Sequence, residues 1–287
     1  MIVTRFAPSP TGFLHLGHAY AALFAWHAAD KAGGKFVLRI EDIDLGRCRS
    51  EFEQAILEDL TWLGVHWEEP VRRQSKHFGD YGEAIARLDR RGLVYSCFCT
   101  RKEIEAEIAR SAEAPQLTDL SAAPYPGTCK RLKPDERARR MAAGAPYALR
   151  LDCAKAIADI DSQPLVFKEN GSGPNGETGH LTAHPELIGD IVLARKGLPA
   201  SYHIAVVTDD ALQGITLVTR GRDLFGATHI QRLLQAILGL PAPEYAHHRL
   251  VLDSQGRKFS KRDRAVSLRT LRQSGATPAD IRTIVGV

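Results

Sequence analysis

The chain contains 287 residues, of which 44% are hydrophobic and 25% are charged, values that exclude a wholly disordered protein and favour one large domain or one domain with an inserted module. Its net charge of +4 is only mildly basic and by itself gives weak support for a polyanionic partner. The odd count of five cysteines, the lack of a signal-peptide pattern and the lack of an apolar run of about 18 residues lead us to expect a soluble, cytoplasmic protein without membrane contact.

The first ninety residues alternate between strand and helix patterns. The predicted elements are a strand over 2–6, a turn over 7–12, a helix over 15–31, a strand over 35–40 and helices over 49–63 and 76–91. Such alternation is typical of a parallel sheet whose strands are joined by crossover helices.

The alternation stops between residues 95 and 185, where closely spaced cysteines, a basic stretch and a glycine-rich loop (170–179) take its place. It resumes with predicted strands over 188–194 and 214–219, a helix over 222–239 and a strand over 247–252. Two short helices end the chain, the second capped by Thr277 with Pro278 at its first position. We therefore predict one α/β sheet domain with an insertion, divided as 1–94, 95–186, 187–262 and 263–287.

The segment His15-Leu-Gly-His18 begins the first predicted helix, directly after a strand and a turn. A helix N-terminus at the carboxyl end of a strand favours a phosphate, and two histidines three residues apart can donate to one polyanion. Gly17 lets a ligand approach the backbone closely. The alternative is that both histidines are ordinary helix residues.

The segment Lys258-Phe-Ser260-Lys261-Arg262 follows the last predicted strand and a turn. Two lysines three apart can neutralise a triphosphate, most of all as charge develops on a leaving pyrophosphate. Alone, this segment is better interpreted as a solvated basic loop.

Together the two segments resemble the HIGH and KMSKS signatures of class I aminoacyl-tRNA synthetases. The departures are Leu16 for Ile, Phe259 for Met and Arg262 for the last Ser, and both lysines remain. Further blocks resemble the glutamyl branch of that class and follow its order: residues 5–12 (RFAPSPTG), 38–42 (LRIED), 200–203 (ASYH), 206–209 (VVTD) and 219–224 (TRGRDL). The resemblance implies a Rossmann-like catalytic domain with an inserted zinc-bearing, tRNA-contacting module. It also implies that ATP, with Mg²⁺, contacts His15, Gly17, His18, Lys258, Ser260 and Lys261, and that His15, His18, Lys258 and Lys261 are catalytic.

L-Glutamate carries two carboxylates and one ammonium, and the chain offers matching groups. Arg5 and Arg220 can form bidentate pairs with carboxylates, and Glu41 can pair with the ammonium. The glutamate site of the resembled family implies the set Arg5, Phe6, Ala7, Pro8, Ser9, Glu41, Tyr202 and Arg220. Which arginine takes which carboxylate stays open. Each residue singly also fits a structural ion pair, such as Arg39 with Glu41 or Asp42.

Cys97, Cys99 and Cys129 bring three thiols from two chain segments, a pattern that suggests a structural zinc site. No histidine lies between the second and third cysteine, and Tyr125 is the candidate fourth ligand from its spacing. The resembled family does bind zinc through a Cys-x-Cys…Tyr-x-x-x-Cys arrangement. The alternative is three free buried thiols. Cys48 and Cys153 are interpreted as structural.

The stretch from Lys130 to Arg140 holds six basic and two acidic residues. It is the best candidate for phosphate contacts with tRNA, and otherwise a solvated helix face.

Only 25 residues follow Arg262, and we expect a monomer that lacks the anticodon-binding region of a full glutamyl-tRNA synthetase. A truncated member of the glutamyl branch implies activation of L-glutamate by ATP without tRNA, then transfer to queuosine at the wobble position of tRNA(Asp). The alternatives are a truncated enzyme that charges a tRNA 3′ end, a catalytically dead paralogue that binds amino acid or tRNA, and another nucleotidyltransferase with a HIGH-type motif. No residue is assigned as general base of the transfer step.

Overall fold

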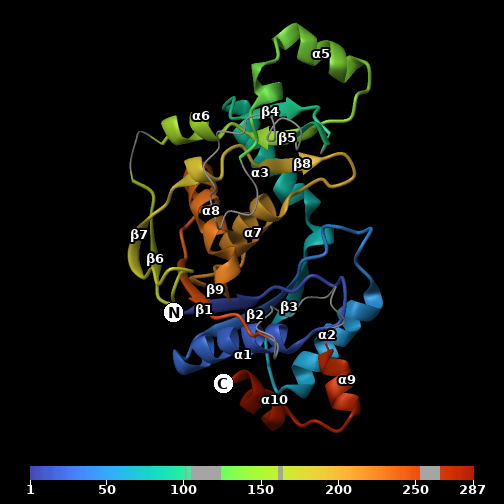
Figure 1. Cartoon of the computed structure of the whole chain (residues 1–287), viewed down its shortest axis with the longest axis vertical. Coiled ribbons are helices and arrows are strands. Elements are labelled where there is room, and N and C mark those ends of the chain that lie inside the picture. The colour runs from blue at the N-terminus through green and yellow to red at the C-terminus, as the bar shows by residue number, and fades with distance from the viewer. Residues whose placement is uncertain (101, 105–123, 161–163, 253–265) are drawn as a thin grey trace.

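A computed structural model of the chain describes residues 1–100, 102–104, 124–160, 164–252 and 266–287 (Figure 1). Its strands are β1 (Val3–Phe6), β2 (Lys35–Ile40), β3 (Glu68–Arg73), β4 (Val94–Cys97), β5 (Ala148–Leu151), β6 (Val166–Glu169), β7 (Gly179–Thr182), β8 (Val192–Arg195), β9 (Leu217–Gly221) and β10 (Glu244–His248). Its α-helices are α1 (Leu16–Lys31), α2 (Ser50–Trp62), α3 (Phe78–Arg90), α5 (Pro134–Ala142), α6 (Cys153–Ala158), α7 (Tyr202–Leu212), α8 (Phe225–Leu238), α9 (Leu268–Gln273) and α10 (Pro278–Val285). Single 3₁₀ turns are η1 (Gln74–Lys76), η2 (Thr128–Arg131), η3 (Pro185–Leu187) and η4 (Arg222–Leu224).

The centre of the molecule is a parallel arrangement of strands. β2 pairs in parallel with β1 and β3, and β10 pairs in parallel with β9 and β6. The two groups meet where the backbone N–H of Thr216, just before β9, donates to the carbonyl of Val3 at 3.0 Å. The order β3-β2-β1-β9-β10 is that of a doubly wound Rossmann-like sheet, which reverses direction of growth between β1 and β9.

Helices cover both faces of this sheet (Figure 1). Leu23 of α1 and Leu60 of α2 are fully buried in one apolar cluster, which also takes in Ile281 of α10. Helices α3, α7 and α8 fill the cluster on the other face. The three-layer arrangement confirms the predicted α/β fold class.

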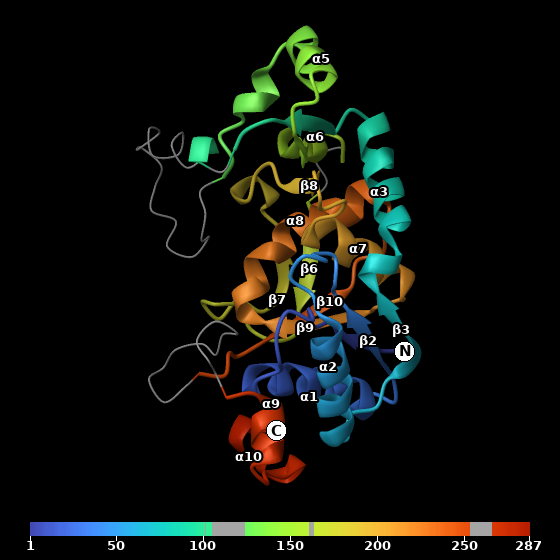
Figure 2. The same cartoon turned by 90° about the vertical axis from the view of Figure 1, so that its right-hand side faces the viewer.

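A smaller antiparallel sheet, β4-β5-β8, lies at the far end of the molecule with α5 and α6 (Figures 1 and 2). β8 follows the predicted boundary at residue 186, yet it pairs with β5, which precedes it. In return, β6 lies before that boundary and pairs with β10. Strands from both sides of residue 186 therefore share sheets, and the division of the chain into domains stays a prediction.

Most predicted elements are confirmed with small shifts at their ends. The strand predicted over 247–252 is wrong: β10 occupies Glu244–His248 instead. β8 and β9 begin four and three residues later than predicted, because η3 and a turn precede them. Thr277 caps α10 as predicted, and its hydroxyl accepts from the backbone N–H of Asp280. Within the described ranges, no helix is long and apolar enough to span a membrane.

Candidate active site and cysteine cluster

The candidate site lies at the carboxyl ends of β1 and β9, the adjacent strands between which the sheet reverses its order. Arg5 is the third residue of β1, and Arg220 is the fourth residue of β9. Both side chains are buried, with 5% and 7% of their surface exposed. In open α/β sheets, ligands bind beyond the carboxyl ends of the strands at the point where the strand order reverses.

Arg5 is held from two sides by the protein. Its Nε donates to Asp210 Oδ1 at 3.1 Å, and its Nη1 donates to the carbonyl of Thr219 at 2.9 Å. The second contact joins β1 to the residue that precedes Arg220. The Nη2 group of Arg5 has no hydrogen bond to the part of the chain that the structure describes, so it remains for a ligand.

Arg39, which is fully buried, supports the same region from β2. Its Nη1 donates to Asp210 Oδ1 at 2.8 Å, and its Nη2 lies 3.3 Å from Glu41 Oε1. Burial opposes ionisation of Asp210, but the guanidinium groups of Arg5 and Arg39 outweigh it and hold the pKa of that carboxyl below its usual value. The alternative pair of Arg39 with Glu41 is therefore present. Asp42 instead accepts from the backbone N–H of Ser75 at 2.8 Å.

Glu41 follows β2 and is mostly enclosed, with 12% of its side chain exposed. Burial raises the pKa of Glu41, and the charges of Arg39 and Arg5 only partly oppose this. A ligand ammonium beside this carboxylate would favour its ionised form.

Arg220 differs from Arg5 because its direct partners in the described structure are uncharged. Its Nε donates to His247 Nε2 at 3.0 Å, its Nη1 to Gln231 Oε1 at 2.8 Å, and its Nη2 to Thr228 Oγ1 at 2.7 Å. Tyr202 lies within 3.4 Å of Nη1. A buried cation without a carboxylate in contact is costly, and an anionic ligand would compensate it.

The other predicted glutamate contacts lie close by on the chain. Phe6 and Pro8 are buried, while Ala7 and Ser9 are partly exposed. The carbonyl of Pro8 accepts from the backbone N–H of Glu41 at 3.0 Å, which joins the loop after β1 to the end of β2. The structure thus brings the predicted set together, and its role in binding glutamate stays a prediction.

His15 and His18 form the N-terminal cap of α1. His15 Nδ1 accepts from the N–H of Gly17 at 3.1 Å, and His18 Nδ1 accepts from the N–H of His15 at 3.2 Å. Because both Nδ1 atoms accept, the proton of each neutral ring lies on Nε2. The rings lie 3.8 Å apart between centroids, and contact of their Nε2–H groups with a phosphate stays a prediction. A Cβ on Gly17 would lie 3.1 Å from the His15 ring, tighter than normal contact.

Lys258, Ser260 and Lys261 lie outside the described residues. The chain on the far side of that segment returns to the histidines: Ser267 forms a bridge with His15, and the N–H of Leu268 donates to the carbonyl of Leu14 at 2.8 Å.

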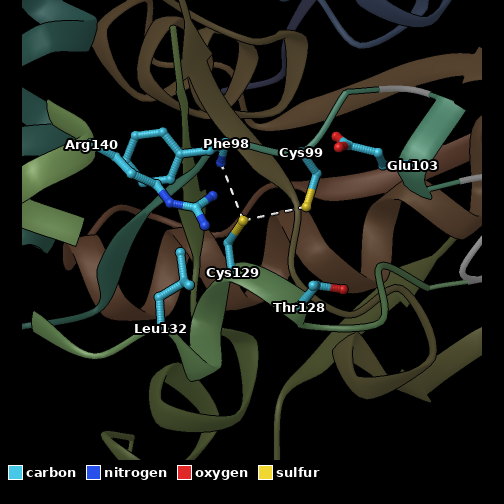
Figure 3. A pocket seen from close by; sticks show the side chains of 7 residues that line it. All are labelled: Phe98, Cys99, Glu103, Thr128, Cys129, Leu132 and Arg140. Carbon is cyan, nitrogen blue, oxygen red and sulfur yellow. Dashed lines mark hydrogen bonds between the residues drawn. The ribbon is translucent and has the colours of Figure 1, made fainter. Parts of the chain in front are cut away.

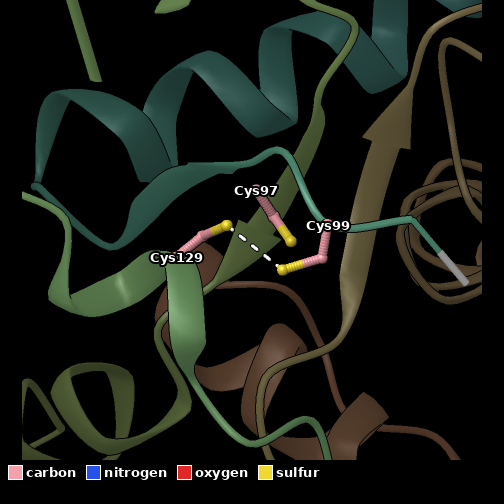
Figure 4. Close-up of side chains that lie close together, drawn as sticks. All are labelled: Cys97, Cys99 and Cys129. Carbon is pink, nitrogen blue, oxygen red and sulfur yellow. Dashed lines mark hydrogen bonds between the residues drawn. The ribbon is translucent and has the colours of Figure 1, made fainter. Parts of the chain in front are cut away.

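Cys97, Cys99 and Cys129 form a cluster at the end of the antiparallel sheet (Figure 4). Their three Sγ atoms all lie within 4.8 Å of one another, and Cys99 Sγ is 3.3 Å from Cys129 Sγ. Sulfurs on one tetrahedral zinc ion, at Zn–S distances of about 2.3 Å, are roughly 3.8 Å apart. The spacing therefore suits a metal ion such as zinc. None of the five cysteines of the chain forms a disulfide.

Tyr125 completes the set predicted from the sequence. Its hydroxyl lies 3.4 Å from Cys97 Sγ and 3.2 Å from Cys99 Sγ, and it accepts from the N–H of Cys129 at 2.9 Å. The Arg150 guanidinium lies 3.9 Å from the centre of the phenol ring, whereas burial and the hydrogen bonds to Cys97 and Cys99 raise the pKa of the Tyr125 hydroxyl. The donor set fits zinc with Tyr125 as fourth ligand.

Without a metal, burial raises the pKa of Cys99 to about 12. Zinc binding would displace that proton, because the thiolate is the ligand. Beside the cluster lies a pocket of about 270 Å³ (Figure 3), lined by Phe98, Cys99, Glu103, Thr128, Cys129, Leu132 and Arg140.

Several basic side chains of the stretch 130–140 form contacts with other residues of the predicted inserted module. Lys130 pairs with Asp152 at 2.5 Å, and Arg140 pairs with Glu136 at 2.8 Å. Arg137 donates to the carbonyl of Cys129 at 3.2 Å. Arg139 contacts Glu136 but keeps 75% of its side chain exposed. Exposed groups such as Arg139 are what this stretch offers to a polyanion.

The sequence patterns did not predict the residues that hold the two arginines. Asp210 and Gln231 lie on α7 and α8, and Glu169 and His247 lie on β6 and β10. The adjacent acids of the segment 206–210 were a signal, since two carboxylates are rarely buried on one helix unless paired.

The parallel sheet, the reversal of strand order between β1 and β9 and the histidine-capped helix are typical of Rossmann-like α/β proteins. The chain belongs to the family of class I tRNA synthetases (E and Q), catalytic domain, whose model matches residues 1–286.

A protein of Rhodobacter capsulatus named glutamyl-Q tRNA(Asp) synthetase is 46% identical, with 100% of both chains covered. The glutamate–tRNA ligase of Aquifex aeolicus is 39% identical over 96% of this chain, which spans 55% of that relative. Among solved structures, the glutamate-tRNA synthetase of Elizabethkingia anophelis superposes with a TM-score of 0.78 at 27% identity, covering 99% of this chain and 61% of that one.

Proposed function

We propose that this chain activates L-glutamate with ATP and transfers the glutamyl group to queuosine at the wobble position of tRNA(Asp). In the first step a carboxylate oxygen of glutamate attacks the α-phosphate of ATP, assisted by Mg²⁺, and gives glutamyl-adenylate and pyrophosphate without tRNA. In the second step a hydroxyl of the modified nucleoside attacks the activated carbonyl and AMP leaves. The proposal includes a monomeric, cytoplasmic enzyme.

The observation that carries this proposal is Arg220, a buried guanidinium whose direct partners in the described structure are all uncharged. Arg5 and Glu41 lie at the neighbouring strand ends. A ligand with two carboxylates and one ammonium therefore suits this site, and glutamate has those groups. The full-length similarity to a glutamyl-Q tRNA(Asp) synthetase supports the choice of acceptor.

The phosphates are assigned to His15, His18, Lys258 and Lys261. The Nε2–H groups of the two histidines and the charges of the two lysines would stabilise the negative charge that develops on the leaving pyrophosphate. Gly17 and Ser260 complete the assigned ATP contacts. The protein's share of catalysis is then positioning and electrostatics.

A second candidate, charging of a tRNA 3′ end, is supported by the similarity to glutamate–tRNA ligases over 96% of this chain. Activation of glutamate is common to both candidates, so the acceptor separates them.

The test is ATP-dependent transfer of labelled glutamate to three acceptors: tRNA(Asp) with queuosine, tRNA(Asp) without it, and tRNA(Glu). We expect label on queuosine-containing tRNA(Asp) alone. Label on tRNA(Glu) would establish 3′ charging instead. No label on any acceptor, together with no glutamate-dependent pyrophosphate exchange, would favour a catalytically dead paralogue.

A further inference from the structure

A chain of buried polar groups crosses three adjacent strands beside the candidate glutamate site. Glu169 ends β6, His247 lies in β10, and Arg220 lies in β9. His247 and Arg220 are direct register partners in the parallel pairing of β10 with β9. The three residues therefore lie side by side at one edge of the sheet, the edge of the carboxyl ends.

The contacts between them are close and enclosed. His247 Nδ1 lies 2.6 Å from Glu169 Oε2, and Arg220 Nε donates to His247 Nε2 at 3.0 Å. Glu169 is 1% exposed and His247 is 2% exposed. Buried contacts of this kind are electrostatically stronger than the same contacts in water.

These contacts fix where the imidazole carries its proton. The Nε of an arginine is always a donor, so Nε2 of His247 must accept with a lone pair. The proton of a neutral ring then lies on Nδ1, where the carboxylate of Glu169 accepts it. His247 is thereby held as the neutral Nδ1–H tautomer.

The glycine-rich loop after β6 secures the carboxylate. The N–H of Gly171 and the N–H of His247 both donate to Glu169 Oε1 at 2.8 Å. A side chain at position 171 would collide with the carbonyl oxygen of His247. Glycine at this position therefore allows the loop to pack closely against β10 and to donate one hydrogen bond to Glu169.

We infer that Glu169 and His247 are positioning residues that act through Arg220 to set the affinity for the substrate carboxylate. The inference rests on the proposed function, in which Arg220 binds glutamate. The imidazole supplies the acceptor that orients the guanidinium. It also keeps the carboxylate of Glu169 one ring away, so that Arg220 contacts no carboxylate among the described residues and can bind one from the ligand.

Two substitutions of His247 separate its contact with Arg220 from its contact with Glu169. His247→Gln places an amide oxygen near the position of Nε2 and can still accept from Arg220. His247→Asn keeps a donor near the position of Nδ1 for Glu169 but loses the acceptor for Arg220. A purely structural role predicts similar effects for both.

The measurement is glutamate-dependent ATP–pyrophosphate exchange, with the KM for glutamate, the KM for ATP and kcat determined separately. We expect His247→Asn to raise the KM for glutamate about tenfold or more, because a hydrogen bond to a charged group is lost, with the KM for ATP unchanged. His247→Gln should stay within about threefold. Glu169→Gln should raise the KM for glutamate as well, since the proton is no longer held on Nδ1.

Glu244→Gln is the matched control. Glu244 also lies in β10, but its carboxylate is 45% exposed and pairs with Lys168 at 3.1 Å. This variant should leave every constant unchanged. Equal effects of the two His247 variants, or a fall in melting temperature without a change in the KM for glutamate, would overturn the inference.

Two further measurements separate failure of this inference from failure of the proposed function. If Arg220→Ala leaves the KM for glutamate unchanged, Arg220 does not bind the substrate and the proposed carboxylate site fails. The ¹⁵N spectrum of the histidine rings tests the contacts among Glu169, His247 and Arg220 without an activity measurement. The His247 signals are assigned by comparison with His247→Gln. A proton on Nδ1 supports the inference, and a proton on Nε2 contradicts it.

Discussion

The buried polar groups of the strand-end site and of the cysteine cluster differ in the partners that stabilise them. At the strand ends, Arg5 and Arg39 meet the carboxylate of Asp210, so the protein supplies both charges itself. At the cluster, Cys97, Cys99 and Cys129 bring three thiols together with only weak hydrogen bonds among them. The first region is organised before any ligand arrives, whereas the second would gain its strongest contacts from a bound metal ion. Perturbations should therefore act differently on the two.

The largest effect is expected at the cysteine cluster. Cys129→Ser should lower the zinc content of purified protein to background, because a thiolate ligand is lost. Cys153→Ser is the control, since Cys153 is buried outside the cluster and bonds to the carbonyl of Pro185. Metal analysis of both variants beside the native chain is the measurement. Native protein with well under one zinc per chain would contradict the assignment.

The next effect separates Arg220 of the strand-end site from its exposed neighbour Arg222. Arg220→Ala should raise the KM for glutamate on the order of 100-fold, because a charge-assisted contact with a carboxylate is lost. Arg222→Ala is the matched control, two residues along the chain and exposed. Pyrophosphate exchange measures both. Equal KM values for glutamate in the two variants would remove Arg220 from the site.

A smaller effect is expected from the protonation of Glu41. Burial raises the pKa of this carboxyl, so acid neutralises it at a higher pH than usual, and the partner of the ligand ammonium is lost. The KM for glutamate should rise as the pH is lowered from 8 through the raised pKa of Glu41, by roughly tenfold. Glu41→Gln should have a high KM that no longer depends on pH. A pH dependence that persists in this variant must come from another group.

The smallest effect concerns a buried carboxylate that lies outside both the strand-end site and the cysteine cluster. Asp59 of α2 is fully buried and has no hydrogen bond within the described structure, although Arg272 lies 3.4 Å from it. Burial raises its pKa to about 6. The folded state therefore takes up a proton as the pH falls through 6, so ionised Asp59 costs stability at neutral pH. Asp59→Asn should stabilise the protein at pH 7.5 by about 1–2 kcal/mol.

Thermal melts at several pH values check this prediction. The gain from Asp59→Asn should shrink towards pH 5, where native Asp59 is protonated as well. Glu51→Gln, at an exposed position of the same helix, is the control. A gain that is the same at every pH would mean that charge is not its cause.

Sequence patterns predicted α1, α2, α3, β1 and β2 from runs of apolar residues between turn residues. The helices α2 and α3 carry an apolar period, whereas α1 is apolar on most of its surface. They misplaced β10, because the apolar run Leu250–Leu252 looks more like a strand than Glu244–His248 does. The true strand carries two histidines, since part of it faces a polar site. β3 was missed for a similar reason, as its residues are charged and include a proline. A polar site replaced the apolar pattern in β10, and an edge position replaced it in β3.

The candidate site divides in the same way. The residues predicted to contact ligands lie in short motifs that can be recognised in the sequence. They are Arg5, the two histidines and the cysteines with Tyr125. The groups that hold those contacts come from elsewhere in the chain. Asp210 and His247 meet the arginines only because strands far apart in sequence become neighbours, and no local pattern contains that information.

The parallel register that places His247 opposite Arg220 also has a consequence for synthesis of the protein. The site draws on residue 5, on residue 41, on residue 169 and on the pairing of β9 with β10. Contacts between such distant segments close long loops and form late. A nascent chain therefore has no complete pocket until β10 has left the ribosome, and binding of the small substrate reports that the last central strand is in place.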